Sequence, residues 1–231
     1  MRKRNIDFII IMSFIFISIN ACKKDKGDDN NNNNETPDPC NNIATATDSE
    51  NNTYNTIVIG NQCWLKENLK LGTKINGQET PSDNNIIEKY CYDDDIANCN
   101  QFGGLYSWNE VMKYSITEGA QGICPAGWHV PKRSEIETLT SQSGVTGLSL
   151  QSTANGSGAS NTTNFTALLG GQRAFSGDFD GLNNKADFWT STEYSSNTYA
   201  YSMSIVKGGT AIDKTFFHKT LGYSVRCIKN S

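Results

Sequence analysis

The chain has 231 residues and an acidic balance, with 24 Asp and Glu against 20 Lys and Arg and a formal net charge of −4. An acidic surface repels phosphate backbones and anionic headgroups, so the composition argues against nucleic acid as a partner. The length allows one domain with a sizeable core once an N-terminal extension is set aside.

The N-terminus has the pattern of a cleaved export signal. Residues 2–4 are all basic, and the apolar stretch over residues 8–19 is too short to span a bilayer as a stable helix. The stretch closes on Ile19-Asn20-Ala21-Cys22, which resembles the lipobox of bacterial lipoproteins. We therefore expect a lipoprotein signal peptide over residues 1–21 and lipidation of Cys22. The alternative is an ordinary secretory signal that happens to contain a cysteine.

Residues 22–42 predict a disordered tether. They include a run of asparagines over residues 30–34, together with Pro37 and Pro39, and scarcely an apolar side chain that could be buried. About twenty flexible residues have an r.m.s. reach of roughly 25 Å. Acyl chains on Cys22 would then hold the domain at a membrane without a spanning helix. We expect an outer-membrane lipoprotein of the cell envelope, and the acidic residues just after Cys22 resemble export signals of surface lipoproteins, which favours outward display.

The domain proper, residues 43–230, begins with a hairpin pattern. Residues 53–59 and 62–69 read as strands about the turn Gly60-Asn61, with Val58 and Trp64 in the core. Residues 106–116 have helical apolar spacing, and so do the residues that follow a capping-box pattern at Ser134. This second helix should end by Gly144.

The rest of the domain has fewer regular patterns. Residues 145–163 are rich in Gly, Ser, Thr and Asn, and this composition predicts an irregular surface loop. From residue 188 onward the alternation of apolar and polar residues predicts several antiparallel strands, including residues 200–206 and 222–228.

Six cysteines follow Cys22, and an even number in an exported chain indicates disulfides. Six cysteines allow fifteen connectivities, and spacing favours one of them. Cys91 and Cys99 flank a short polar loop whose ends can meet. A Cys40–Cys63 bond would fasten the N-terminal arm to the first hairpin, and a Cys124–Cys227 bond would join the middle of the fold to its last strand. These three pairs are therefore expected. Zinc binding is the alternative role for these cysteines, but the chain has no CxxC pair and only two histidines.

Five blocks of the sequence together resemble a known family, the Fibrobacter succinogenes major paralogous domain. In chain order they are YNTIVIGNQCWLKENL at 54–69, GGLYSW at 103–108, CPAGWHVP at 124–131, FWTSTE at 188–193 and GYSVRC at 222–227. The resemblance covers nearly the whole domain. It implies an α+β, C-type-lectin-like fold, with two short helices packed on a twisted, loop-rich antiparallel sheet. In that fold a disulfide ties a helix region to the final strand, which suits the Cys124–Cys227 pair. The family is known mainly as a surface and secreted module without an agreed activity.

A calcium-dependent lectin site does not carry over from this resemblance. The Glu-Pro-Asn, Gln-Pro-Asp and Trp-Asn-Asp triplets of sugar-binding members are absent from the sequence. Asp178, Asp180 and Asn183 are spaced like part of a calcium loop, but its closing bidentate Glu is missing, and a solvated turn explains them equally. We therefore expect no cofactor, with calcium as the open alternative.

The sequence also lacks the common catalytic patterns. It has no Gly-x-Ser-x-Gly elbow and no His-Glu-x-x-His, and His129 between Trp128 and Val130 reads as a packed, hydrogen-bonded residue. The implied fold is similar to that of sulfatase-activating oxidases, which use a reactive cysteine pair, but six bridged cysteines would leave no such pair. Arg173 and Arg226 either pair with carboxylates inside the fold or clamp an anionic ligand. No catalytic residue is expected.

These observations predict a lipid-anchored, non-catalytic binding module for an external glycan or protein, with a role such as adhesion. Tyr194, Tyr199 and Tyr201 lie in a Ser- and Asn-rich stretch and are the candidate contact residues, because Tyr provides a large contact area at small entropic cost. Simple strand packing is the alternative for them. A structural envelope component without a ligand and an oxidoreductase-like enzyme are the alternative functions.

Overall fold

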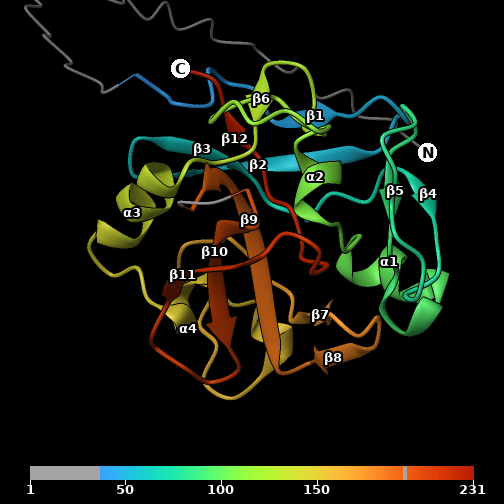
Figure 1. The fold of residues 1–231 in the computed structure, drawn as a ribbon. Helices are drawn as coiled ribbons and strands as arrows, with labels where there is room; N and C mark the ends of the chain where they lie inside the picture. Colours follow the sequence, from blue (N-terminus) through green and yellow to red (C-terminus); the bar gives the residue numbers. More distant parts are fainter. Residues whose placement is uncertain (1–36, 195–196) are drawn as a thin grey trace, which may run out of the picture. The chain divides into compact units, whose positions relative to one another are not determined.

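The computed structural model describes residues 37–194 and 197–231, and Pro37–Ser231 form a compact unit (Figure 1). The lipidation candidate Cys22 and the signal peptide lie outside the described residues. The compact unit includes the last six residues of the expected tether. The strands are β1 (Thr45–Thr47), β2 (Thr53–Ile59), β3 (Gln62–Leu65), β4 (Thr73–Lys74), β5 (Glu88–Lys89), β6 (Trp128–His129), β7 (Gly170–Arg173), β8 (Phe179–Leu182), β9 (Lys185–Glu193), β10 (Tyr199–Val206), β11 (Asp213–His218) and β12 (Ile228–Lys229). The helices are α1 (Ile96–Phe102), α2 (Trp108–Val111), α3 (Arg133–Ser141) and α4 (Gly147–Leu150), with 3₁₀ turns at Tyr92–Asp94 and Thr153–Asn155.

The first sheet has the strand order β1-β2-β3-β12-β6 and contains the predicted hairpin. β2 and β3 pair antiparallel about Gly60-Asn61, and Gly60 takes φ +60°, a conformation that glycine adopts at little cost. Trp64 is fully buried as expected. The prediction for Val58 is wrong, because this side chain is 41% exposed on the outer face of β2.

The second sheet has the order β11-β10-β9-β7-β8. The long hairpin β9–β10 forms its centre, and the whole of β11 pairs antiparallel with the first six residues of β10. The expected strand over residues 200–206 is confirmed as part of β10. The expected strand over residues 222–228 is confirmed only at its end, because residues 222–224 make isolated bridges to three different segments before β12 begins.

The helices are short, and their bounds differ from the predicted ones. The helix expected over residues 106–116 is limited to α2, because Lys113 and Tyr114 both adopt left-handed φ angles and end it. α3 begins two residues earlier than the Ser134 capping box predicts, because Lys132 is the N-cap residue, and the Glu135 carboxylate accepts a 2.7 Å hydrogen bond from the backbone N–H of Lys132. The stretch over residues 145–163 contains α4 and one 3₁₀ turn, so it is more regular than expected.

The expectation of an α+β, C-type-lectin-like fold is wrong. The described residues form a mainly β structure with two five-stranded sheets and one two-stranded sheet. α3 has nine residues and each of the other α-helices in the described residues has seven or fewer, so the helices are too short to form a continuous layer over a sheet. No helix among residues 37–194 and 197–231 is both long and apolar enough to cross a bilayer.

Two buried tryptophans join the α2 region to β9 by reciprocal hydrogen bonds. The Trp108 indole N–H donates to the Thr190 carbonyl at 2.8 Å, and the Trp189 indole N–H donates to the Tyr106 carbonyl at 2.8 Å. Both indoles are at most 1% exposed, and the ring of Trp189 also packs on Tyr223 at 4.5 Å between centroids. A buried donor left unpaired costs about 1–3 kcal/mol, so the two bonds hold these segments in one position.

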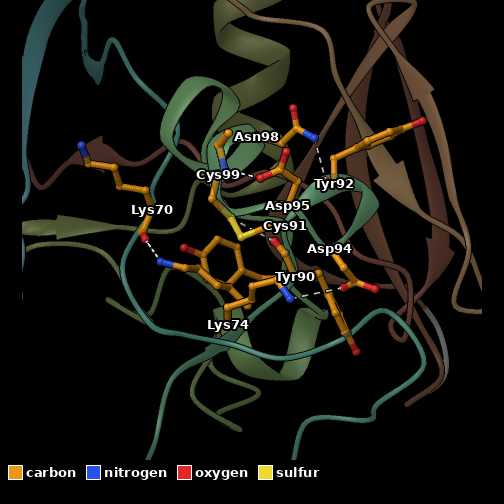
Figure 2. Close-up of a disulfide and its surroundings, with 12 residues drawn as sticks. Lys70, Lys74, Tyr90, Cys91, Tyr92, Asp94, Asp95, Asn98 and Cys99 are labelled. Atoms are coloured by element: carbon orange, nitrogen blue, oxygen red, sulfur yellow. Dashed lines mark hydrogen bonds and ion pairs between the residues drawn. A yellow bond between two sulfur atoms is a disulfide. The ribbon is translucent and has the colours of Figure 1, made fainter.

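Three disulfides connect the described cysteines, and they are the pairs that spacing favours: Cys40–Cys63, Cys91–Cys99 and Cys124–Cys227. Cys91–Cys99 closes the loop that leads into α1 (Figure 2). In that loop Asp95 accepts from the backbone N–H of Ala97, and the Asn98 amide donates to the Tyr92 carbonyl at 2.8 Å. The loop is therefore ordered by side-chain caps as well as by the covalent bond.

Removing Cys124–Cys227 should destabilise the domain more than removing Cys91–Cys99. The two bonds span 103 and 8 residues respectively, and in the loop-entropy model this corresponds to about 4.7 and about 2.5 kcal/mol. Urea unfolding of the oxidised full chain, compared with the two double Cys→Ala variants, measures the difference. Equal losses of unfolding free energy would contradict this prediction.

Candidate ligand-binding surface

Aromatic side chains gather on one face of the second sheet. Tyr199 and Tyr201 lie two residues apart on β10, and their partners in register on β11 are His218 and Phe216. Alternate residues of a strand point to the same face, so these four side chains lie side by side. Tyr194, just after β9, stacks on Phe216 with ring centroids 3.6 Å apart and planes 5° apart. We call these five residues the aromatic surface.

The rings of the aromatic surface contact one another in a continuous network. Tyr201 lies edge-on to Tyr194 at 5.6 Å, and Tyr199 lies edge-on to both Phe216 and His218. Tyr199 is 39% exposed, and the other four rings are partly exposed. The rings support one another from the side, as aromatic pairs prefer, while part of each remains open to solvent.

The aromatic surface is the part of this sheet face that α3 leaves uncovered. Further along β10, Met203 and Ile205 continue the same face but are fully buried in the core cluster that also contains Ile136 and Leu139 of α3. Figure 1 shows α3 beside strands β9 and β10, which it contacts. Arg133, the first residue of α3, places its guanidinium 4.1 Å from the centre of the Tyr201 ring. The boundary between covered core and open aromatic surface therefore lies at Arg133.

A cavity of about 200 Å³ opens next to the aromatic surface. Arg173 at the end of β7 and Lys219 just after β11 both line it, as do the polar side chains of Ser107 and Asn109. None of its lining residues is acidic. We call this space the cationic cavity.

The two cations of the cavity are held differently. Arg173 is only 6% exposed; its Nε donates to the Gly77 carbonyl and its Nη1 to the Thr220 carbonyl. Its guanidinium lies 4.8 Å from the centre of the Tyr90 ring, and it has no carboxylate partner within the described residues. Lys219, in contrast, is paired with Glu193 and lies 3.9 Å from the centre of the Trp108 ring.

Phe175 connects the cavity to the aromatic surface. It lines the cavity, is 70% exposed, and packs edge-on against His218 at 5.3 Å. A ligand group in the cavity would therefore have aromatic rings directly beside it.

The structure brings the three candidate contact residues Tyr194, Tyr201 and Tyr199 together. Sequence reasoning missed Phe216, His218 and Phe175, which complete the surface. The alternation over residues 213–218 could have identified Phe216 and His218 as sharing one strand face. Their position opposite the tyrosines depends on strand register, which the sequence did not show.

Two of the three candidate calcium ligands, Asp178 and Asp180, already have protein partners. Asp178 accepts from the Ser176 hydroxyl at 2.8 Å, Asp180 lies 3.8 Å from the Lys185 ammonium, and Asn183 forms a turn with φ 58°. Within residues 37–194 and 197–231, no group of three or more His, Cys, Asp or Glu side chains could hold a metal ion.

Arg226 supports the core. It is 2% exposed, and its Nη2 donates to Asn68 at 2.6 Å while its guanidinium lies 4.2 Å from the centre of the Phe165 ring. Burial lowers the pKa of Arg226 to about 9. Arg226 has no carboxylate partner among the described residues, and its contacts indicate a structural role.

His129 is packed and hydrogen-bonded, as predicted. Its Nδ1 lies 2.8 Å from the Asn230 side chain and its Nε2 lies 3.0 Å from the Glu135 carboxylate. Burial acts to lower the pKa of His129, but its hydrogen bond to Glu135 and the charge of that carboxylate outweigh burial and raise the pKa above its ordinary value. Burial conversely acts to raise the pKa of Glu135, and the bonds to His129 and to the Lys132 backbone N–H lower it. The pair links β6 to α3.

A family model described as Fibrobacter succinogenes major domain matches residues 57–229 of the chain. The match covers both sheets from β2 onward and includes the aromatic surface and the cationic cavity. Neither the curated proteins nor the solved structures contain a significant match.

The His129–Glu135 pair should make stability depend on pH. The raised pKa of His129 gives stabilisation that is complete below its ordinary value of 6.5 and is lost as the pH rises through the folded pKa. The lowered pKa of Glu135 gives stabilisation that is present above 4.5 and is lost as the pH falls through the folded pKa. Glu135→Gln should therefore lower the unfolding free energy more at about pH 5.5 than at about pH 8.5, while Gln still caps the helix.

Urea unfolding at the two pH values tests this expectation. Glu137→Gln is the matched control, because Glu137 pairs only with the exposed Arg133 on the same helix. A loss for Glu135→Gln that does not change with pH would show that the pair is not charged in the folded protein.

Proposed function

The chain belongs to the Fibrobacter succinogenes major domain family, and since that family has no assigned activity, we propose a function from the site itself. The protein is a lipid-anchored component of the cell envelope, held in the outer membrane and facing outward. Its domain is a non-catalytic binding module, and an external glycan binds to it at the aromatic surface.

The aromatic surface is the observation that carries this proposal. An exposed cluster of aromatic rings on a soluble domain marks an interaction site more often than an isolated apolar residue does. Tyr rings provide a flat apolar face and a hydroxyl, which suits sugar rings with apolar C–H faces and polar edges. Because the rings of Tyr194, Tyr201 and Phe216 brace one another, little side-chain entropy remains to be lost on binding.

A partner protein is the second candidate for the same surface. Arg133 stacked on Tyr201 at the edge of the aromatic surface is the combination of residue types that dominates protein interfaces. The cavity beside the surface favours the glycan, because a small recess with both polar and aromatic lining fits a single sugar or substituent better than a flat protein face does.

The two other functions receive less support. An oxidoreductase-like enzyme would need a reactive cysteine pair, and each cysteine in the described part of the chain is in a disulfide. A purely structural envelope component would not need exposed aromatic rings beside a buried arginine that has no carboxylate partner among the described residues.

The location is argued from the N-terminal sequence. A basic start, a short apolar stretch and Cys22 are the parts of a lipoprotein signal, and the disulfides require an oxidising compartment. Two or three acyl chains, at about 0.8 kcal/mol for each buried methylene, hold such a protein firmly at a membrane.

Cys22→Ser should abolish acylation and leave the chain unprocessed at residue 21. Intact-mass spectrometry of the membrane fraction would show acyl mass on the wild-type chain and none on the variant. Ala21→Ser, which keeps a small residue before the cysteine, serves as the control. A wild-type chain that is cleaved at another residue and carries no acyl mass would contradict the anchor.

Replacing rings of the aromatic surface should abolish glycan binding. The double variant Tyr199→Ala/Phe216→Ala should lose at least about tenfold in affinity, because central aromatic contacts contribute about 2 kcal/mol or more. A glycan array probed with the full chain in detergent identifies the bound glycan, and titration calorimetry then measures the loss.

Val206→Ala is the matched control, since Val206 is exposed at the other end of β10. Urea unfolding of each variant separates lost binding from lost folding. Full affinity in the folded double variant would show that the ligand binds elsewhere.

A further inference from the structure

We infer that the cationic cavity is an anion subsite, so that the glycan bound by the aromatic surface carries a carboxylate or sulfate group. This inference rests on the proposed function and specifies its ligand. It comes from the charge and hydrogen bonding of Arg173, from the lining of the cavity, and from the connection through Phe175.

Arg173 is a buried charge without a counter-charge. Burying an ion is costly unless an opposite charge compensates it, and the described residues contribute no carboxylate to this guanidinium. Two of its nitrogens bond to backbone carbonyls, while Nη2 has no hydrogen-bond partner among residues 37–194 and 197–231. A planar guanidinium with a free nitrogen at a cavity wall is suited to an oxyanion.

The rest of the lining also suits an anion. Lys219 also lines the cavity, but Glu193 compensates its charge, so Arg173 is the cation of the lining that lacks a carboxylate partner in the described structure. The Ser107 hydroxyl and the Asn109 amide add donors that have no acceptor in the described structure. Two acidic side chains contact residues of the lining, but neither forms an ion pair with Arg173. Glu193 pairs with Lys219, and Glu110 accepts from the Tyr114 hydroxyl at 2.6 Å and from the Glu88 backbone N–H at 2.9 Å.

Size and position make the cavity a subsite of a larger site. At about 200 Å³ it is smaller than the roughly 300–1,000 Å³ of complete small-molecule pockets, so it accommodates one end or one substituent of a ligand. Phe175 joins it to His218 and thereby to Tyr199. A glycan could place its acidic group beside Arg173 and its neighbouring sugars on the aromatic rings.

Paired probes that differ only in charge test the inference. One pair is an oligogalacturonide and its methyl ester, which tests a carboxylate; the other is dextran sulfate and dextran, which tests a sulfate. The full chain in detergent should bind the charged member of at least one pair at least about tenfold more tightly in titration calorimetry. The pair that shows the preference identifies the anion.

Asn109→Asp should remove this preference, because it places a carboxylate at an exposed position of the same cavity that Arg173 lines. Asn51→Asp is the matched control, with the same change in net charge at an exposed turn of the first sheet. Arg173→Lys, which keeps the charge but loses the planar fork, should weaken the preference as well. If Arg173→Lys does not fold, Asn109→Asp still decides the outcome.

The possible results separate the inference from the proposed function. Equal binding of both members of each pair, or a preference that Asn109→Asp leaves unchanged, would overturn the anion subsite and leave a neutral glycan site in place. Binding of none of the four probes, together with an empty glycan array, would overturn both.

Discussion

The structure depends on the reciprocal hydrogen bonds of Trp108 and Trp189. Each indole donates to a backbone carbonyl beside the other, so the α2 region and β9 are fixed against each other by two buried bonds that have no water to replace them. Both tryptophans lie in blocks that carry the family resemblance. A loop-rich domain with few helices needs such fixed points, and the Cys124–Cys227 disulfide adds a covalent one.

This junction also positions the candidate site. Trp108 provides the ring on which Lys219 lies, and Trp189 anchors the strand at the centre of the second sheet. The aromatic surface therefore lies on elements held by fully buried side chains, although its own rings are partly open to solvent. A rigid support of this kind lowers the entropic cost of binding a ligand.

Local features of the fold could be predicted from the sequence, and features that depend on long-range register could not. Gly60-Asn61 between two apolar strands is a short-range signal, and the first hairpin formed about the predicted turn, although its second strand ends at Leu65 and not at Leu69. The helix after Tyr106 was predicted too long, because apolar spacing does not reveal the left-handed φ of Lys113 and Tyr114. The C-type-lectin-like fold came from the resemblance, and the short helices contradict it. Tyr199 and Tyr201 were identified from composition, whereas the cavity combines residues from distant segments of the chain.

Hydrogen exchange of the full chain, measured by mass spectrometry with and without the charged probe that it binds, oligogalacturonide or dextran sulfate, tests the account most directly. The account predicts slower exchange in peptides from β10 and β11 and at Arg173, with no change in the β1–β2 hairpin on the other sheet. Slower exchange confined to the first sheet would contradict the claim that the aromatic surface and the cationic cavity form the binding site.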